Sequence, residues 1–100
     1  FVSISGTFTP GSGNHYVVAV FRGTVCIWAA DVYAGGANQI QPFPPCNFLD
    51  SPASTLAQTY SVRVGPAAAT TMYINRQTSG SANYMGGAAI CTLTLTEIKG

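Results

Sequence analysis

Apolar and polar side chains alternate in several stretches of the chain, which is the pattern of β-strands with one buried face. Residues 1–9 alternate apolar residues or glycine with serine and threonine. Residues 59–64 alternate tyrosine and valine with small polar residues and arginine, and residues 88–98 alternate cysteine and leucine with threonine. Nowhere do apolar residues recur at helical spacing for long enough to form a helix. The pattern therefore predicts an all-β protein.

Residues 16–21 depart from this pattern because they are apolar on both faces of the predicted strand. One face begins with Tyr16 and the other begins with Val17. A strand covered on both sides is unusual in a two-layer sandwich, unless the outer face of one sheet contacts another subunit. We therefore expect the chain to associate with copies of itself.

Turn-forming residues separate the predicted strands. They are concentrated in residues 10–14, 22–24, 33–38, 65–69 and 77–87. Residues 39–45 hold three prolines, which cannot donate to a sheet ladder, so this segment is expected at a sheet edge or in a crossover. About eight short strands separated in this way predict a single antiparallel jelly roll or β-sandwich over residues 1–100.

The chain is poor in charged residues, with 7% charged and 47% hydrophobic residues, whereas soluble domains carry about 25% charged residues. We expect other subunits to cover much of so apolar a surface. The four basic residues are scattered singly and the net charge is +1, so the chain has no cationic footprint for nucleic acid. The longest apolar run, residues 16–33, is interrupted by Arg22 and Asp31, which argues against membrane insertion.

The cysteines Cys26, Cys46 and Cys91 are odd in number and widely spaced, unlike the paired framework of a disulfide-rich secreted domain. Cys26 and Cys91 lie in apolar strand contexts, where a thiol behaves as a small hydrophobic group. We therefore expect buried thiols without disulfides. Such thiols fit assembly in a reducing cytoplasm.

Few residues of the chain could carry catalytic chemistry. A glycosidase needs two carboxylates beside the scissile bond, and only Asp31, Asp50 and Glu97 are available. Asp50 stands in a Leu-Asp-Ser-Pro turn, where its side chain is suited to accept backbone N–H bonds, although a carboxylate pair formed between subunits remains an alternative. The single histidine, His15, is expected in an exposed loop and makes no zinc site unless a trimer axis brings three copies together. We therefore expect no enzymatic activity, no bound metal and no cofactor.

Four motifs occur in a characteristic order in the second half of the chain. They are Phe-Leu-Asp-Ser-Pro at 48–52, Thr-Tyr at 59–60, Tyr-Ile-Asn-Arg at 73–76 and a threonine-rich strand at 91–98. In this order and spacing the chain resembles the C-terminal domains of phage tail-fibre and related virion fibre proteins, while the first half matches them only in strand rhythm. The resemblance implies a jelly roll similar to the tumour-necrosis-factor and C1q heads that assembles as a homotrimer. It also implies the C-terminal tip of a longer fibre, with other virion proteins as partners, on a virion assembled in the host cytoplasm.

The function that this resemblance implies is a virion structural protein, a tail-fibre head for host-surface recognition, adhesion and trimerisation. Weak contacts on three copies, multiplied over several fibres, would give avidity. By analogy with the family, loops at one end would contact a host glycan or protein, and the candidate residues in them are Asn14, His15, Tyr33, Asn38, Asn83 and Tyr84. The alternatives are a capsid decoration or fibre trimerisation head without receptor binding, and a C1q-like carbohydrate-binding module.

Overall fold

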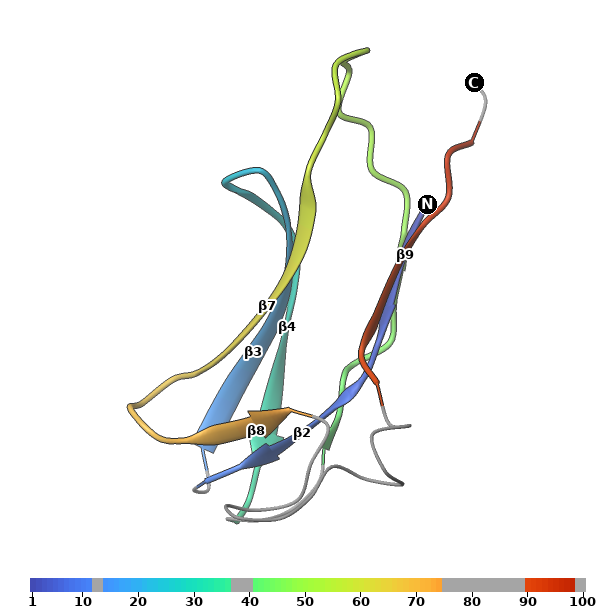
Figure 1. Ribbon diagram of the computed structural model, residues 1–100. Coiled ribbons are helices and arrows are strands. Elements are labelled where there is room, and N and C mark those ends of the chain that lie inside the picture. The colour runs from blue at the N-terminus through green and yellow to red at the C-terminus, as the bar shows by residue number, and fades with distance from the viewer. Residues whose placement is uncertain (12–13, 37–40, 75–89, 99–100) are drawn as a thin grey trace.

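The computed structural model of the chain describes residues 1–11, 14–36, 41–74 and 90–98 (Figure 1). These residues form nine β-strands and no helix, so the predicted all-β class is confirmed. None of them, accordingly, belongs to a helix of the length and hydropathy that crossing a membrane requires. The strands are β1 (Val2–Ser5), β2 (Thr7–Pro10), β3 (Asn14–Arg22), β4 (Val25–Ala34), β5 (Gln41–Pro42), β6 (Cys46–Phe48), β7 (Tyr60–Pro66), β8 (Met72–Ile74) and β9 (Thr92–Leu95).

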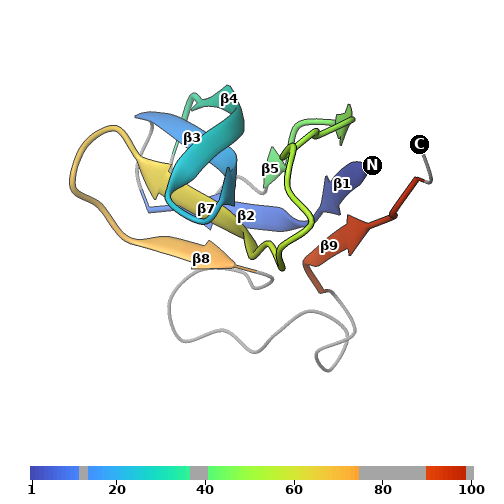
Figure 2. The same ribbon diagram turned by 90° about the horizontal axis from the view of Figure 1, so that it is seen from above.

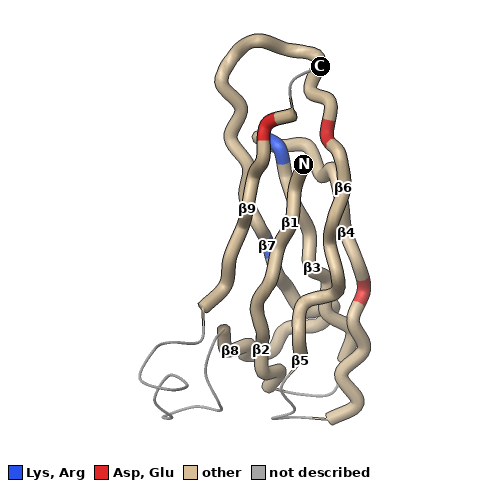
Figure 3. The backbone as a smooth tube through the Cα atoms, turned by 90° about the vertical axis from the view of Figure 1, so that its right-hand side faces the viewer, with Lys and Arg blue, Asp and Glu red and all other residues tan. Residues whose placement is uncertain are grey.

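The strands pair into three antiparallel sheets of three strands each, with the orders β4-β3-β7, β6-β1-β9 and β5-β2-β8. The first two sheets face each other as two layers (Figures 1 and 3). The view from above shows β3 and β4 on one side of the molecule and β1 with β9 on the other (Figure 2). The third sheet continues from the second, because only one residue separates β1 from β2. The arrangement is consistent with a β-sandwich.

The core lies between the layers and is built from the alternation seen in the sequence. Tyr16, Val18 and Val20 point inward from β3 and are fully buried, as is Phe8 of β2. The rings of Phe8 and Tyr16 lie 5.2 Å apart in a tilted arrangement, and the opposite layer contributes Val2 from β1. Full burial of each such side chain stabilises the fold by about 1.5–3 kcal/mol, so this cluster is the main source of stability.

Gly6 allows the chain to pass from β1 into β2 at a crowded point. A Cβ atom there would lie 2.5 Å from the Sγ of Cys91 and 2.7 Å from the ring of Phe43. The Gly6 carbonyl also accepts a hydrogen bond of 2.8 Å from the backbone N–H of Phe43. Because no side chain fits between these groups, glycine is required at the junction of the two sheets.

The β3–β4 hairpin contains a bulge that decides which side chains share a face. Its turn has two residues, and Gly23 supplies the positive φ of 59° that the first of them adopts. Arg22 pairs with Val25 beside the turn, but the register then shifts so that Ile27 is left unpaired. A shift by one residue turns all later side chains of β4 to the opposite face.

Several predicted segment boundaries are wrong, among them that of the single strand expected over residues 1–9, which is divided at Gly6 into β1 and β2. The turn expected to begin at Gly65 begins later, because β7 continues through Gly65 and Pro66, which pair with β3. β7 is the outer strand of its sheet, a position in which proline is tolerated. The final strand, expected over residues 88–98, is limited to Thr92–Leu95. The proline-rich segment 39–45 does supply an edge strand, as predicted, since β5 lies at the end of its sheet.

The cysteines form no disulfide, and only one of them is buried as predicted. Cys46 lies in the core, and burial raises the pKa of its thiol. Cys26 and Cys91 are exposed. Cys26 lies before the bulge, opposite Phe21 on the outer face, and the bulge turns Trp28 to the inner face, so the two residues do not share a face. Cys91 lies just before the short outer strand β9, where no further strand of the described chain covers it.

Candidate functional site

Two of the predicted binding residues, His15 and Tyr33, meet on the outer face of the β4-β3-β7 sheet, and Asn14 lies next to His15 on the other face of β3. Asn14 and His15 begin β3, and Tyr33 lies near the end of β4, so they occupy strand ends and not the loops that the sequence suggested. His15 and Tyr33 are cross-strand partners, and their ring centroids lie 5.0 Å apart. The side chain of Asn14 accepts a hydrogen bond of 2.8 Å from the backbone N–H of His15. The other candidates, Asn38, Asn83 and Tyr84, lie outside the described residues.

Asp31 completes this group of side chains. Its Oδ2 lies 2.7 Å from the Nδ1 of His15, and the two side chains are 57% and 55% exposed. We refer to His15, Asp31 and Tyr33 together as the exposed cluster. Sequence reasoning considered Asp31 only as a catalytic acid. The signal that it missed is the spacing of two residues between Asp31 and Tyr33, which places both on one face of a strand.

The bulge at Ile27 creates the exposed cluster. A regular hairpin continued from the Arg22–Val25 pair would place His15 opposite Val32. The unpaired residue shifts this register by one, so that His15 faces Tyr33 and lies diagonally across from Asp31. Diagonal neighbours on antiparallel strands are within reach of long and aromatic side chains.

The exposed cluster offers several groups to a ligand. Tyr33 is 65% exposed, and its ring can stack on an apolar surface while its hydroxyl bonds to a polar one. The hydroxyl of Tyr33 and the Oδ1 of Asp31 have no hydrogen-bond partner within the part of the chain that the structure describes. A hydrogen-bonded pair this exposed contributes little to stability. The cluster is therefore suited to recognition and contributes little to the fold.

A flat apolar strip extends from the exposed cluster along the same face. Val17 pairs with both Asp31 and Gly65, and Ala19 pairs with Ala29, so these small residues share the outer face of the sheet. Val17 remains 41% exposed, and a Cβ atom added to Gly65 would meet no other atom within 4 Å. Such a surface accommodates a flat apolar face of a partner.

Arg63 and Phe21 close the other end of the strip. The guanidinium of Arg63 lies 4.0 Å from the centre of the Phe21 ring. A cation–π contact at an exposed site contributes about 0.5–1 kcal/mol. The side chain of Arg63 thus covers the outer face of β3 at Phe21, whereas the part of that face near Val17 remains exposed to solvent.

A second cluster of similar composition, which we call the shielded cluster, joins Arg22, Asp50 and Tyr60. Asp50 accepts hydrogen bonds from the guanidinium of Arg22 at 2.5 Å and from the hydroxyl of Tyr60 at 2.6 Å, one on each carboxylate oxygen. The side chains of Arg22 and Asp50 are only 23% and 9% exposed. These bonds tie the segment after β6 to the paired ends of β3 and β7. Asp50 therefore has a structural role.

The shielded cluster shifts the pKa values of its members. Burial raises the pKa of Asp50, but the hydrogen bonds from Arg22 and Tyr60 outweigh burial and hold that pKa below its usual range. The hydrogen bond to Asp50 raises the pKa of the Tyr60 hydroxyl and that of the Arg22 guanidinium. Asp50 is thus favoured as the carboxylate, and Tyr60 and Arg22 are favoured in the protonated forms that donate hydrogen bonds to it.

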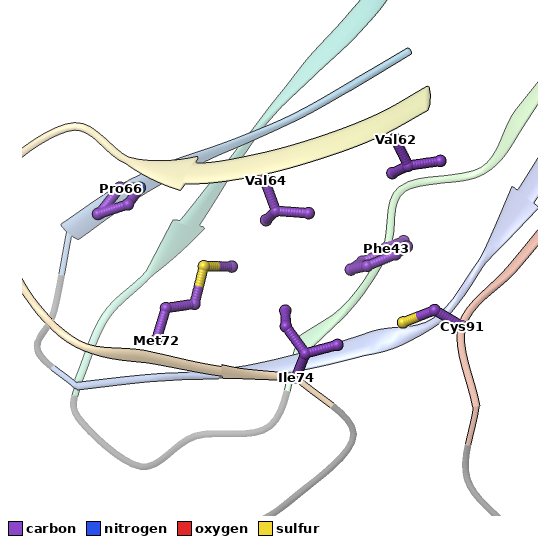
Figure 4. A pocket seen from close by; sticks show the side chains of 7 residues that line it. All are labelled: Phe43, Val62, Val64, Pro66, Met72, Ile74 and Cys91. Carbon is purple, nitrogen blue, oxygen red and sulfur yellow. The ribbon is translucent and has the colours of Figure 1, made fainter. Parts of the chain in front are cut away.

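An apolar cavity of about 440 Å³ lies between β7 and β8 (Figure 4). Side chains from the two strands point toward one another across it. Its lining consists of Phe43, Val62, Val64, Pro66, Met72, Ile74 and Cys91. None of these described lining side chains is charged.

A larger groove of about 910 Å³, which we call the terminal groove, lies beside the first and last described residues. The segment that follows β6 forms one of its sides. Exposed apolar side chains line it, namely Phe1, Leu49, Leu56, Leu95 and Ile98. Large apolar side chains gathered in this way are typical of a surface that contacts another protein.

No group of three or more His, Cys, Asp or Glu side chains in the described ranges lies close enough together to hold a metal ion. The chain matches no protein-family model, no curated protein and no solved structure. Its role must therefore be argued from the chemistry of the surfaces described above.

Proposed function

We propose that the chain is the homotrimeric jelly-roll head of a virion fibre and that it attaches the particle to a host surface. The observation that supports adhesion is the exposed cluster beside the flat apolar strip. An exposed aromatic ring next to hydrogen-bonding groups suits a surface glycan or protein. One such site binds weakly, and three copies in each head, on several fibres, raise the avidity. The role is non-enzymatic.

Trimerisation is supported by the amount of apolar surface that a single copy leaves in contact with water. Charged residues make up only 7% of the chain, and few appear along the described backbone (Figure 3). The terminal groove is lined by exposed apolar side chains, and none of the exposed-cluster residues lines it. A cyclic trimer joins two different surfaces of each copy, so it can cover the terminal groove and leave the exposed cluster open to a ligand. Covering the groove removes apolar area from water.

The first test is the solution mass of the purified protein by light scattering. The proposal predicts a mass near three times the 10.4 kDa of one chain. A mass of 10.4 kDa would contradict the trimer and remove the explanation for the apolar surface.

The second test is binding of the purified protein to an array of bacterial surface polysaccharides. Tyr33→Ala removes the exposed ring and should weaken binding about tenfold, the loss of roughly one stacking contact. Val25→Ala is the matched control, because Val25 is an exposed residue at the other end of β4. If the Tyr33→Ala protein still forms trimers and binds the array as well as the unaltered protein does, the chain is a trimerisation head that does not bind the receptor through the exposed cluster.

A further inference from the structure

We propose that the apolar cavity between β7 and β8 is a binding site for an aliphatic chain, separate from the adhesive outer face. Val62, Val64 and Pro66 line it from β7, and Met72 and Ile74 line it from β8. The sulfur of Cys91 points toward the same space (Figure 4). The volume of about 440 Å³ falls within the usual range for small-molecule sites.

The chemistry of the lining selects the class of ligand. Among the residues that the structure describes, every lining side chain is a hydrocarbon, a thioether or a thiol, and none is charged. A bound water needs two to four polar partners, and an ion or a sugar would lose its hydration without replacement hydrogen bonds. An uncharged hydrocarbon loses nothing on entering and is therefore the matching occupant.

The position of the cavity gives a ligand access. β7 and β8 are outer strands of their sheets, and in the described part of the chain no further strand pairs with either on this side. A molecule can enter between them without breaking a sheet ladder. Any charged or polar head of the ligand would stay outside, in solvent.

A strand from a second copy is a poorer occupant than an aliphatic chain. β8 has only three residues, and Pro66, at the end of β7, has no N–H to donate to an added strand. Both layers contribute to the lining, so the space is the interior of the sandwich and not an outer face. A flexible hydrocarbon fills such a space without needing backbone partners.

The unaltered protein tests this proposal with N-phenyl-1-naphthylamine, an uncharged fluorescent probe, and 1-decanol as competitor. We expect saturable binding of one probe per chain and its displacement by decanol. Decanol at ten times its Kd should also slow alkylation of Cys91 by iodoacetamide about tenfold, because about one site in ten stays open. Alkylation of Cys26, on the outer face, should not change. Non-saturable binding, or decanol that slows both cysteines equally, would overturn the proposal.

A pair of substitutions locates the site. Val64→Trp places a large ring in the cavity and should weaken probe binding at least tenfold. Val17→Trp adds the same ring on the opposite face of the same sheet and should leave binding unchanged. Equal binding by a folded Val64→Trp protein and the unaltered one would show that the probe binds elsewhere. If Val64→Trp does not fold, the alkylation of Cys91 in the unaltered protein decides the matter alone.

Discussion

The shielded and exposed clusters are built from the same three kinds of side chain, a basic residue on β3, an aspartate and a tyrosine. In the shielded cluster both oxygens of Asp50 are bonded and little of the side chain reaches water. In the exposed cluster more than half of the Asp31 side chain reaches water, and its Oδ1 has no partner in the described part of the chain. A carboxylate that is fully bonded stabilises the fold, and one that is half bonded has an acceptor left for a ligand.

The largest difference between the clusters is expected for replacement of the aspartate. Asp50→Asn removes the charge that pairs with the partly buried guanidinium of Arg22 and leaves that cation without a counter-ion. We expect the Tm to fall by about 10 °C, since one or two kcal/mol shift the Tm of a domain of this size by that order. Circular dichroism during heating at neutral pH measures it. A Tm within about 2 °C of the unaltered protein would mean that the shielded cluster is not structural.

Acid should destabilise the protein through the shielded cluster. The pKa of Asp50 is lower in the folded protein than in the unfolded chain. Its carboxylate therefore contributes stability above the ordinary aspartate pKa of about 3.9, and this contribution is lost as the pH falls through the lowered value. Between about pH 6 and pH 2, the Tm of the unaltered protein should fall more steeply than the Tm of Asp50→Asn. Parallel curves would contradict this assignment.

A smaller difference is expected when only the hydroxyl groups are removed. Tyr60→Phe deletes one hydrogen bond to Asp50 and keeps the ring, so the free energy of unfolding should fall by about 1 kcal/mol. Tyr33→Phe is the matched control, because the hydroxyl of Tyr33 has no partner in the described ranges. Urea denaturation measures both. An equal loss of unfolding free energy in Tyr60→Phe and Tyr33→Phe would mean that the two clusters do not differ in their contribution to stability.

The sequence predicts the strands better than it predicts the clusters. Alternation is a local property, so β1, β3 and β7 could be read from neighbouring residues, whereas the inward face of β3 could not, because residues 16–21 are apolar on both faces. The Arg22–Asp50 bond joins residues 28 positions apart, and it forms because the segment after β6 passes the end of β3. No local pattern contains that information.

The exposed cluster could be predicted only in part, for a different reason. The residues Asn14, His15 and Tyr33 were identified by their types, but the pairing of His15 with Tyr33 depends on the bulge at Ile27. A bulge inserts one extra residue into a strand, and neither the turn residues nor the alternation of residues 25–34 marks where it falls. The same unpaired residue turns Trp28 inward and leaves Cys26, which was predicted to be buried, on the opposite and exposed face.

The smallest effect on stability is expected for Asp31→Asn, although this variant makes the same change as Asp50→Asn. The pair with His15 is exposed, so its loss should change the Tm by no more than about 2 °C. Binding to the polysaccharide array should nevertheless weaken, because the carboxylate is the stronger acceptor for a ligand hydroxyl. An unchanged Tm together with reduced binding would establish that the exposed cluster serves recognition. A Tm loss as large as that of Asp50→Asn would instead make both clusters structural and would leave the outer face without a binding role.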